Sequence, residues 1–155
     1  MKVKKCRICL SKDLNIVFSL GRQPLANNLL SSLKEKKKVF PLELVQCGHC
    51  GLIQLNYVVP KEKMFDNYFY IPSISKTYVK HFVNLSKTFI KELNLQSGNL
   101  IVDIGGSDGS LLLPFKKEGM EVVNIEPAKN ITSKVTKINK YFDKKTAQDI
   151  VKRYG

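Results

Sequence analysis

Leu100-Ile101-Val102-Asp103-Ile104-Gly105-Gly106-Ser107-Asp108-Gly109 is the stretch that decides the fold of this chain. Its first five residues form a nearly continuous apolar run, which is typical of a strand buried in a parallel sheet. The glycines that follow let the backbone turn tightly and approach a ligand closely. Residues 111–115 then carry apolar side chains at helical spacing. This order of strand, glycine loop and helix predicts an α/β domain.

A second apolar strand is predicted at residues 122–125, and it ends at Glu126. A carboxylate in that place accepts both hydroxyl groups of a ribose, so the pattern favours a nucleoside site at the carboxyl end of the sheet. S-adenosylmethionine fits such a site because it carries a ribose and a sulfonium but no phosphate. We predict that it contacts the glycine loop and the two strand ends through Asp103, Gly105, Gly106, Asp108, Gly109 and Glu126.

The sheet counted from the sequence is small. A third strand is expected near residues 138–142, whereas a doubly wound sheet has about five to seven strands. We therefore expect residues 98–155 to form the first part of a Rossmann-like domain, truncated, with an unpaired edge on the third strand. Pro114 lies about five residues into the expected helix, so either the helix begins later or its first turn is irregular.

Residues 61–97 are expected to form an aromatic linker followed by a helix. Apolar side chains recur at spacings of three, four and seven from Val79 to Leu93, and Ser75 could cap this helix. The rings of Phe65, Tyr68, Phe69 and Tyr70 have two interpretations: they seat one module on the next, or they line a ligand pocket. Spacing alone favours the packing role.

Two C-x2-C pairs, Cys6 with Cys9 and Cys47 with Cys50, predict a zinc site in residues 1–60. Each pair forms a tight turn that directs both sulfurs at one ion, and four thiolates complete a tetrahedral shell with no position left for water. The site is therefore expected to be structural. Strand-like residues 16–20, 40–46 and 52–55 suggest a zinc-ribbon-like hairpin, with a loop at residues 21–28. His49 is expected to face solvent.

The net charge of +13 raises the possibility of an anionic partner. Lysines make up 23 of the 26 basic residues and are scattered, whereas nucleic-acid binders favour arginine and stacking aromatics. We therefore do not expect nucleic acid as the partner. No run of about 18 apolar residues is present, so no membrane contact is expected. No apolar run follows the basic residues 1–6, so a secretory signal is not expected and the chain is interpreted as cytoplasmic, where four cysteines favour metal ligands over disulfides.

Several longer stretches together point to one family. They are Cys6-Arg7-Ile8-Cys9, Leu20-Gly21-Arg22-Gln23-Pro24-Leu25-Ala26-Asn27, Tyr68-Phe69-Tyr70-Ile71-Pro72-Ser73-Ile74-Ser75, Asp103-Ile104-Gly105-Gly106-Ser107-Asp108-Gly109-Ser110-Leu111-Leu112 and Asn124-Ile125-Glu126-Pro127-Ala128. On these stretches the chain resembles the zinc-binding sugar C-methyltransferases, including the NDP-deoxysugar C-3-methyltransferases. Pro72 stands where the family usually has serine, and Ser107 where asparagine is common.

The resemblance implies an α/β fold in which a small zinc-ribbon-like module precedes an incomplete class I methyltransferase domain. It implies the N-terminal portion of an S-adenosylmethionine-dependent C-methyltransferase that acts on a nucleotide-linked keto-deoxysugar, with Tyr68 and Tyr70 contacting the substrate. The family's catalytic Tyr-x-Glu-His stretch has no counterpart here. No catalytic residue is therefore assigned, and a separate polypeptide could complete the fold. The alternative is a zinc-ribbon module that binds nucleic acid or is related to RNA methyltransferases.

Overall fold

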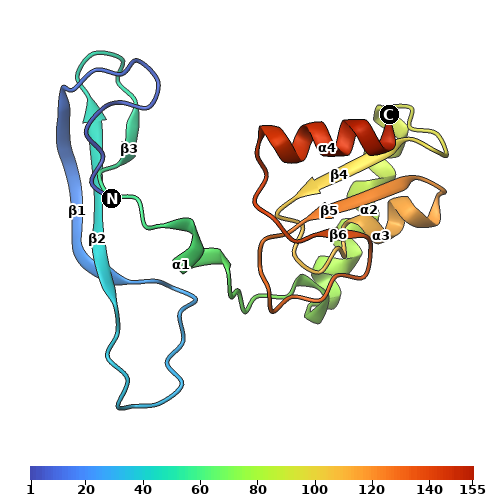
Figure 1. Cartoon of the computed structure of the whole chain (residues 1–155), viewed down its shortest axis with the longest axis horizontal. Helices are drawn as coiled ribbons and strands as arrows, with labels where there is room; N and C mark the ends of the chain where they lie inside the picture. Colours follow the sequence, from blue (N-terminus) through green and yellow to red (C-terminus); the bar gives the residue numbers. More distant parts are fainter. The chain divides into compact units, whose positions relative to one another are not determined.

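Two three-stranded sheets organise this chain, one antiparallel and one parallel. The computed structural model describes residues 1–155 and divides into two units, Met1–Met64 and Phe65–Gly155 (Figure 1). The chain is α/β, as the sequence predicts. None of its helices combines the length and the apolar composition that crossing a bilayer requires.

The sheet of the first unit has the order β1-β2-β3 and contains β1 (Leu14–Pro24), β2 (Val39–Cys47) and β3 (Ile53–Leu55). β2 and β3 confirm the expected strands at residues 40–46 and 52–55. β1 runs longer than expected, because residues 21–24, predicted as loop, still pair with β2. Two register shifts between Ile16 and Arg22 bend β1 and allow this continued pairing.

The first unit has a thin apolar core. Its buried hydrophobic residues are Cys6, Val45 and Cys47, whereas Ile16 and Phe18 on β1 are 62% and 52% exposed. So few buried side chains do not offset the entropy of ordering about 60 residues. An additional cross-link, such as a bound metal ion, is therefore needed to hold this unit together.

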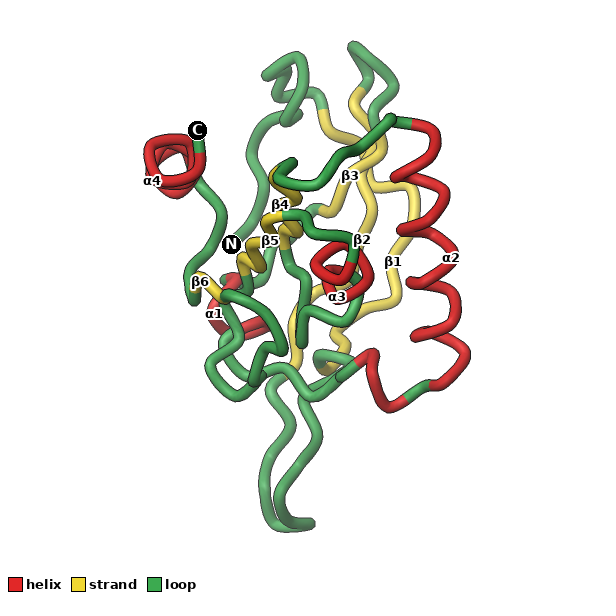
Figure 2. The backbone as a smooth tube through the Cα atoms, turned by 90° about the vertical axis from the view of Figure 1, so that its right-hand side faces the viewer, coloured by secondary structure: helices red, strands yellow, loops and turns green.

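The second unit contains the parallel sheet. After α1 (Lys61–Phe65) and a short 3-10 turn, η1 (Pro72–Ile74), the chain forms α2 (Lys76–Glu92), β4 (Leu100–Ile104), α3 (Leu112–Lys117), β5 (Glu121–Ile125), β6 (Lys137–Ile138) and α4 (Lys144–Tyr154). The sheet order is β4-β5-β6. Figures 1 and 2 show α4 on one side of this sheet and α2 and α3 on the other.

Side chains pack on both faces of the central strand β5, which explains its continuous apolar run. On the α3 side, Leu112, Phe115 and Val122 belong to one buried cluster. On the α4 side, Val123, Ile125 and Ile150 form a second cluster. Successive residues of β5 therefore point to opposite faces. Packing of helices on both sides fixes the position of the strand ends that carry the candidate site.

The helices confirm two details of the sequence analysis. Ser75 caps α2, since its hydroxyl oxygen accepts a hydrogen bond of 3.3 Å from the backbone nitrogen of Tyr78. α3 begins only at Leu112, so Pro114 lies in the first turn, where its missing N–H costs no helical hydrogen bond. The later start of the helix thus accommodates the proline.

The expected bounds of the third strand need correction, whereas its expected unpaired edge is present, since β6 pairs with β5 alone. β6 covers Lys137 and Ile138, not residues 138–142, because the Asn139 side chain turns back to donate to the Glu126 carbonyl at 2.7 Å. The strand order also gives the sheet two edges, β4 and β6. Exposed apolar side chains lie on β4, where Val102 and Ile104 are 36% and 57% exposed.

Candidate metal centre and strand-end pocket

The four predicted zinc ligands come together in the first unit. The sulfurs of Cys6, Cys9, Cys47 and Cys50 all lie within 4.8 Å of one another. Cys6 Sγ is 3.5 Å from Cys50 Sγ, and Cys9 Sγ is 3.5 Å from Cys47 Sγ. A tetrahedral ion with Zn–S bonds of about 2.3 Å requires sulfurs about 3.8 Å apart. The cluster therefore fits a zinc ion with little adjustment.

Two similar turns hold the sulfurs. The Leu10 nitrogen donates to the Cys6 carbonyl at 3.0 Å, and the Gly51 nitrogen donates to the Cys47 carbonyl at 2.9 Å. Leu10 and Gly51 both adopt left-handed backbone conformations, with φ of 63° and 73°. Each C-x2-C pair is thus closed by the same kind of turn, once with a leucine and once with a glycine.

Backbone donors stabilise thiolates in these turns. The N–H groups of Cys9 and Ile8 lower the pKa of Cys6 to about 6. The N–H groups of Cys50 and His49 lower the pKa of Cys47 against the opposing effect of burial. The Ser11 N–H also lowers the pKa of Cys9, but burial and the neighbouring thiols outweigh it and raise that pKa to about 12. Four crowded sulfurs cannot all ionise alone, and a divalent cation removes this conflict.

His49 is exposed and lies outside the sulfur cluster, as the sequence analysis expects. Since four thiolates complete a tetrahedral shell, the arrangement offers a metal no coordination site for water or substrate. Its chemistry is that of a structural zinc centre.

The second candidate site is a pocket at the carboxyl ends of β4 and β5. Its volume is about 360 Å³, within the range of small-molecule sites. Loop, strand-end and aromatic residues line it, namely Phe65, Tyr68, Ile104, Gly105, Ser107, Ile125, Glu126, Pro127, Tyr141 and Phe142. In an open α/β sheet this edge is where ligands bind. The pocket therefore combines apolar walls with one carboxylate.

Glu126 is the one carboxylate that lines this pocket, and it is only 6% exposed. Its Oε2 accepts a hydrogen bond of 2.9 Å from the Ser107 nitrogen, and its Oε1 accepts one of 2.7 Å from the Ala128 nitrogen. These two backbone groups fix the carboxylate in one orientation. Since each carboxylate oxygen has a second lone pair, the group can still accept hydrogen bonds from a ligand.

Asp103 lies beside the pocket and has an unfavourable environment for its charge. Burial, and then the nearby Glu126 carboxylate, raise the pKa of Asp103. A Cβ atom on Gly106 would lie 2.6 Å from Asp103 Oδ2 and 2.7 Å from Asn124 Oδ1, so only glycine fits between these oxygens. The Asn124 oxygen is buried and has no hydrogen-bond partner. This corner of the loop is therefore rich in acceptors, of which Asn124 is fully buried and Asp103 is partly exposed.

The other predicted loop residues serve the loop itself. Asp108 is 2% exposed, and its Oδ1 accepts a hydrogen bond of 3.2 Å from the Ser110 nitrogen. Burial opposes its ionisation, but hydrogen bonds from Ser73 and Ser110 and the charge of Lys134 lower the pKa of Asp108. Gly109 has φ of 74° and leaves no room for a side chain next to Val135. The structure thus places Gly105 and Glu126 in the pocket lining, and Asp108 and Gly109 outside it.

The two predicted substrate-contacting tyrosines separate. Tyr68 lines the strand-end pocket, whereas Tyr70 is 46% exposed and packs edge-on against Tyr78 at 6.2 Å between ring centroids. Burial and a hydrogen bond with Tyr78 raise the pKa of Tyr70. The Tyr70 carbonyl accepts a hydrogen bond of 3.4 Å from the Ser107 hydroxyl.

A polar clamp, formed by Asp66, Lys129, Asn130 and Tyr141, holds the segment 65–70 against the strand ends. The Tyr68 nitrogen donates to Asn130 Oδ1 at 2.9 Å, and Asn130 Nδ2 donates to the Tyr68 carbonyl at 2.8 Å. Asp66 accepts from Lys129 Nζ at 2.9 Å and from the Tyr141 hydroxyl at 2.8 Å. These bonds turn an irregular segment into a wall of the pocket.

Sequence reasoning missed the pocket residues that follow the third strand. Tyr141 and Phe142 line the pocket although they are distant in sequence from the glycine loop. The signal was available, because residues after each parallel strand reach the same edge of the sheet. The clamp residues Asp66 and Asn130 had no such signal, since no motif or periodicity marks them.

Comparison with known proteins agrees with this geometry. Residues 6–65 match a family described as "Putative zinc binding domain". Over 160 aligned residues the chain is 30% identical to the C-methyltransferase NovU of Streptomyces niveus, an alignment that covers 99% of this chain and 38% of that protein. The chain thus spans well under half of the length of this relative. The two matches confirm the resemblance to C-methyltransferases with a zinc-binding module.

Proposed function

We propose that this chain is the zinc-binding and cofactor-binding portion of an S-adenosylmethionine-dependent C-methyltransferase that acts on a nucleotide-linked keto-deoxysugar. The observation that carries the proposal is the pocket at the ends of β4 and β5, where a fixed carboxylate faces aromatic and aliphatic walls. The similarity to a C-methyltransferase over nearly the whole chain supports it. The structural zinc centre would hold the first unit in shape.

Each predicted contact has a physical reason. The oxygens of Glu126 would accept the two ribose hydroxyls, while Gly105, which has no side chain, would allow the ligand to approach the backbone. Apolar side chains such as Ile104 and Pro127 would enclose the adenine ring. S-adenosylmethionine would supply the methyl group as a sulfonium, and the partly exposed carboxyl group of Asp103 would favour the positively charged end of that molecule.

Substrate contacts are proposed for Tyr68 and Tyr70. Tyr68 reaches the pocket, and Tyr70 lies near its rim through the Ser107 hydrogen bond. Neither histidine of the chain lines this pocket, and His81 lies exposed on α2 beside Phe82. We therefore assign no catalytic base. The proposal concerns binding of the cofactor and of part of the substrate.

Titration of the zinc-loaded protein with S-adenosylmethionine in a calorimeter tests this function. We expect saturable binding that Glu126→Gln weakens by roughly tenfold or more, because hydrogen bonds to a charged group contribute about 1.5–3 kcal/mol. Glu121→Gln, at the exposed start of the same strand, is the matched control and should bind normally. The proposal fails if Glu126→Gln binds like the parent, or if the protein binds no S-adenosylmethionine.

A further inference from the structure

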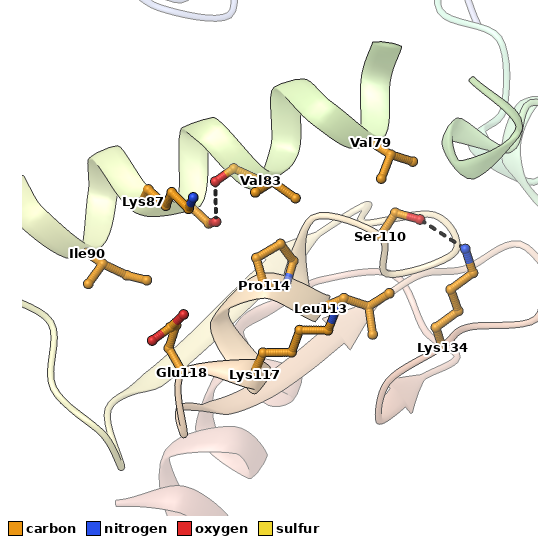
Figure 3. Close-up of a pocket in the computed structure, with 11 residues that line it drawn as sticks. Val79, Val83, Lys87, Ile90, Ser110, Leu113, Pro114, Lys117, Glu118 and Lys134 are labelled. Atoms are coloured by element: carbon orange, nitrogen blue, oxygen red, sulfur yellow. Dashed lines mark hydrogen bonds between the residues drawn. The ribbon is translucent and has the colours of Figure 1, made fainter. Parts of the chain in front are cut away.

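A second pocket of the Phe65–Gly155 unit lies in a groove between α2 and α3 (Figure 3). It shares no lining residue with the strand-end pocket. Its volume is about 230 Å³, room for roughly seven or eight water molecules at about 30 Å³ each. The groove can therefore hold a small organic molecule, and nothing in the proposed methyl transfer uses it.

The floor of this groove is apolar. Val79, Val83 and Ile90 of α2 face Leu113 and Pro114 of α3 across the space (Figure 3). Ser86 also lines the groove, but it is 1% exposed and its hydroxyl donates to the Val83 carbonyl at 2.9 Å. Its polar group is thus satisfied within α2. A ligand would therefore meet hydrocarbon along the length of the floor.

The rim of the groove carries an excess of positive charge. Lys87, Lys117 and Lys134 line it, and Glu118 is the one acidic residue of the lining. Lys134 Nζ lies 3.4 Å from Oδ2 of Asp108, which stands just behind the groove. Counted together, the three lysines, Glu118 and Asp108 leave a net charge of +1 over the groove as a whole. The groove is therefore matched to a ligand with a single negative charge.

The polar groups also give the groove a direction. Ser110 and Lys134 stand at one end, and Glu118 stands at the other (Figure 3). An ammonium group carries three N–H donors, of which Lys134 directs one to Ser110 Oγ at 3.4 Å, while its charge pairs with that of Asp108 at 3.4 Å. A donor therefore remains for a ligand. The anionic group of a ligand would therefore lie beside Lys134, away from Glu118.

We propose that the α2–α3 groove binds a small apolar monocarboxylate, with its hydrocarbon part on the Val83–Leu113 floor and its carboxylate beside Lys134. A dianion would leave one negative charge unbalanced on an apolar floor, which is unfavourable. A cationic amphiphile would meet three lysines and one carboxylate. The charge balance and the floor together select the monocarboxylate.

Titration of the full zinc-loaded chain by nuclear magnetic resonance tests the proposal with three matched probes: hexanoate, hexanamide and hexylamine. Hexanoate should shift the amide signals of Val83, Ser110 and Leu113 and bind about tenfold more tightly than hexanamide, as expected for one charge-assisted hydrogen bond. Hexylamine should bind more weakly still. Equal affinities for the three probes, no saturable binding, or shifts centred on Tyr68 and Tyr141 would overturn the proposal.

A pair of neighbouring lysines on α3 provides the control. Lys117 lines the groove, whereas Lys116 is exposed and lies outside its lining. Lys117→Gln should weaken hexanoate severalfold and leave hexanamide unchanged, and Lys116→Gln should change neither. Both replacements lie in the exposed last turn of α3, so the fold should tolerate them. Identical hexanoate affinities for the two variants would contradict the assignment of the carboxylate to the α2–α3 groove.

Discussion

Leu10 and Gly51 occupy equivalent places in the two zinc-binding turns, yet they are different residues. Both have positive φ, a conformation in which a residue with a side chain is strained by roughly 1–2 kcal/mol. Leu10 is 66% exposed, so its side chain gains little from burial. The first turn is therefore strained at one residue, whereas the second is not.

Replacing Leu10 by glycine should stabilise the zinc unit. Relief of the strain, less the greater freedom that glycine has in the unfolded chain, leaves a gain of about 0.5–1 kcal/mol. The reverse experiment, Gly51→Leu, should destabilise by a similar or larger amount. Removal of the bound zinc by a chelator, followed during urea unfolding, measures the effect of both replacements on stability. A Leu10→Gly variant that releases zinc more readily would contradict this account.

Asp103 provides a test that depends on pH. Because the pKa of Asp103 is raised in the folded protein, the folded state holds its proton more tightly than the unfolded state. Stability contributed by this group is therefore present at pH below the unfolded value of about 3.9 and is lost as the pH rises through the folded pKa. Asp103→Asn replaces the ionisable group by a neutral one, so the variant does not lose this stability as the pH rises. We expect a higher melting temperature than the parent at pH 7, and no such advantage near pH 3.

The polar clamp is the feature that matters most at the scale of elements. Segment 65–70 has no regular structure beyond the end of α1, so the two hydrogen bonds of Asn130 replace the pairing that a strand would provide. Together with the bonds of Asp66 they place Phe65 and Tyr68 in the wall of the strand-end pocket. Of the four clamp residues only Tyr141 lines the pocket, and the other three act by holding the segment in place.

Asn130→Ala should therefore free the segment and weaken S-adenosylmethionine binding while the sheet stays folded. Loss of two hydrogen bonds at about 1 kcal/mol each favours the open segment and makes it a better substrate for proteases. Limited proteolysis within residues 65–70, with and without S-adenosylmethionine, measures the effect. Asn67→Ala, an exposed neighbour, is the control. Equal cleavage rates for the two variants would show that the clamp does not hold the segment.

The same elements show what a sequence can and cannot predict. β4, β5 and α2 follow from local periodicity and from the Ser75 cap, and the four cysteines follow from ligand spacing. The extension of β1 through residues 21–24 depends on two register shifts set by β2, and the early end of β6 depends on the Asn139 side chain. Contacts between residues distant in sequence determine where these two strands end, so local sequence patterns do not predict it.

At the scale of the whole molecule, the two units on either side of residue 64 are stabilised in different ways. The first unit has few buried hydrophobic residues and four clustered thiols, whereas the second has apolar clusters on both faces of its sheet. Metal binding in such a module amounts to much of its folding free energy, about 10 kcal/mol or more for structural zinc. The second unit holds no cysteine, so we expect its folding not to depend on the metal.

Cys47→Ser should consequently unfold residues 1–64 and leave residues 65–155 folded. Amide signals of β1 and β2 should collapse toward unfolded positions, while those of β4 and β5 keep their dispersion. Excess chelator added to the parent protein should give the same pattern. A Cys47→Ser variant that keeps the dispersed signals of β2 in the absence of zinc would refute the structural role of the metal.

The Asn130 clamp also bears on the order in which the molecule assembles. It joins Tyr68 to a residue 62 positions later in the chain, and it can form only after β5 has placed the following loop. Contacts of such long sequence separation are slow to form, because a long loop must close before they contribute. We therefore expect the segment at 65–70 to order last, so that a newly folded chain has its sheet before it has a ligand pocket.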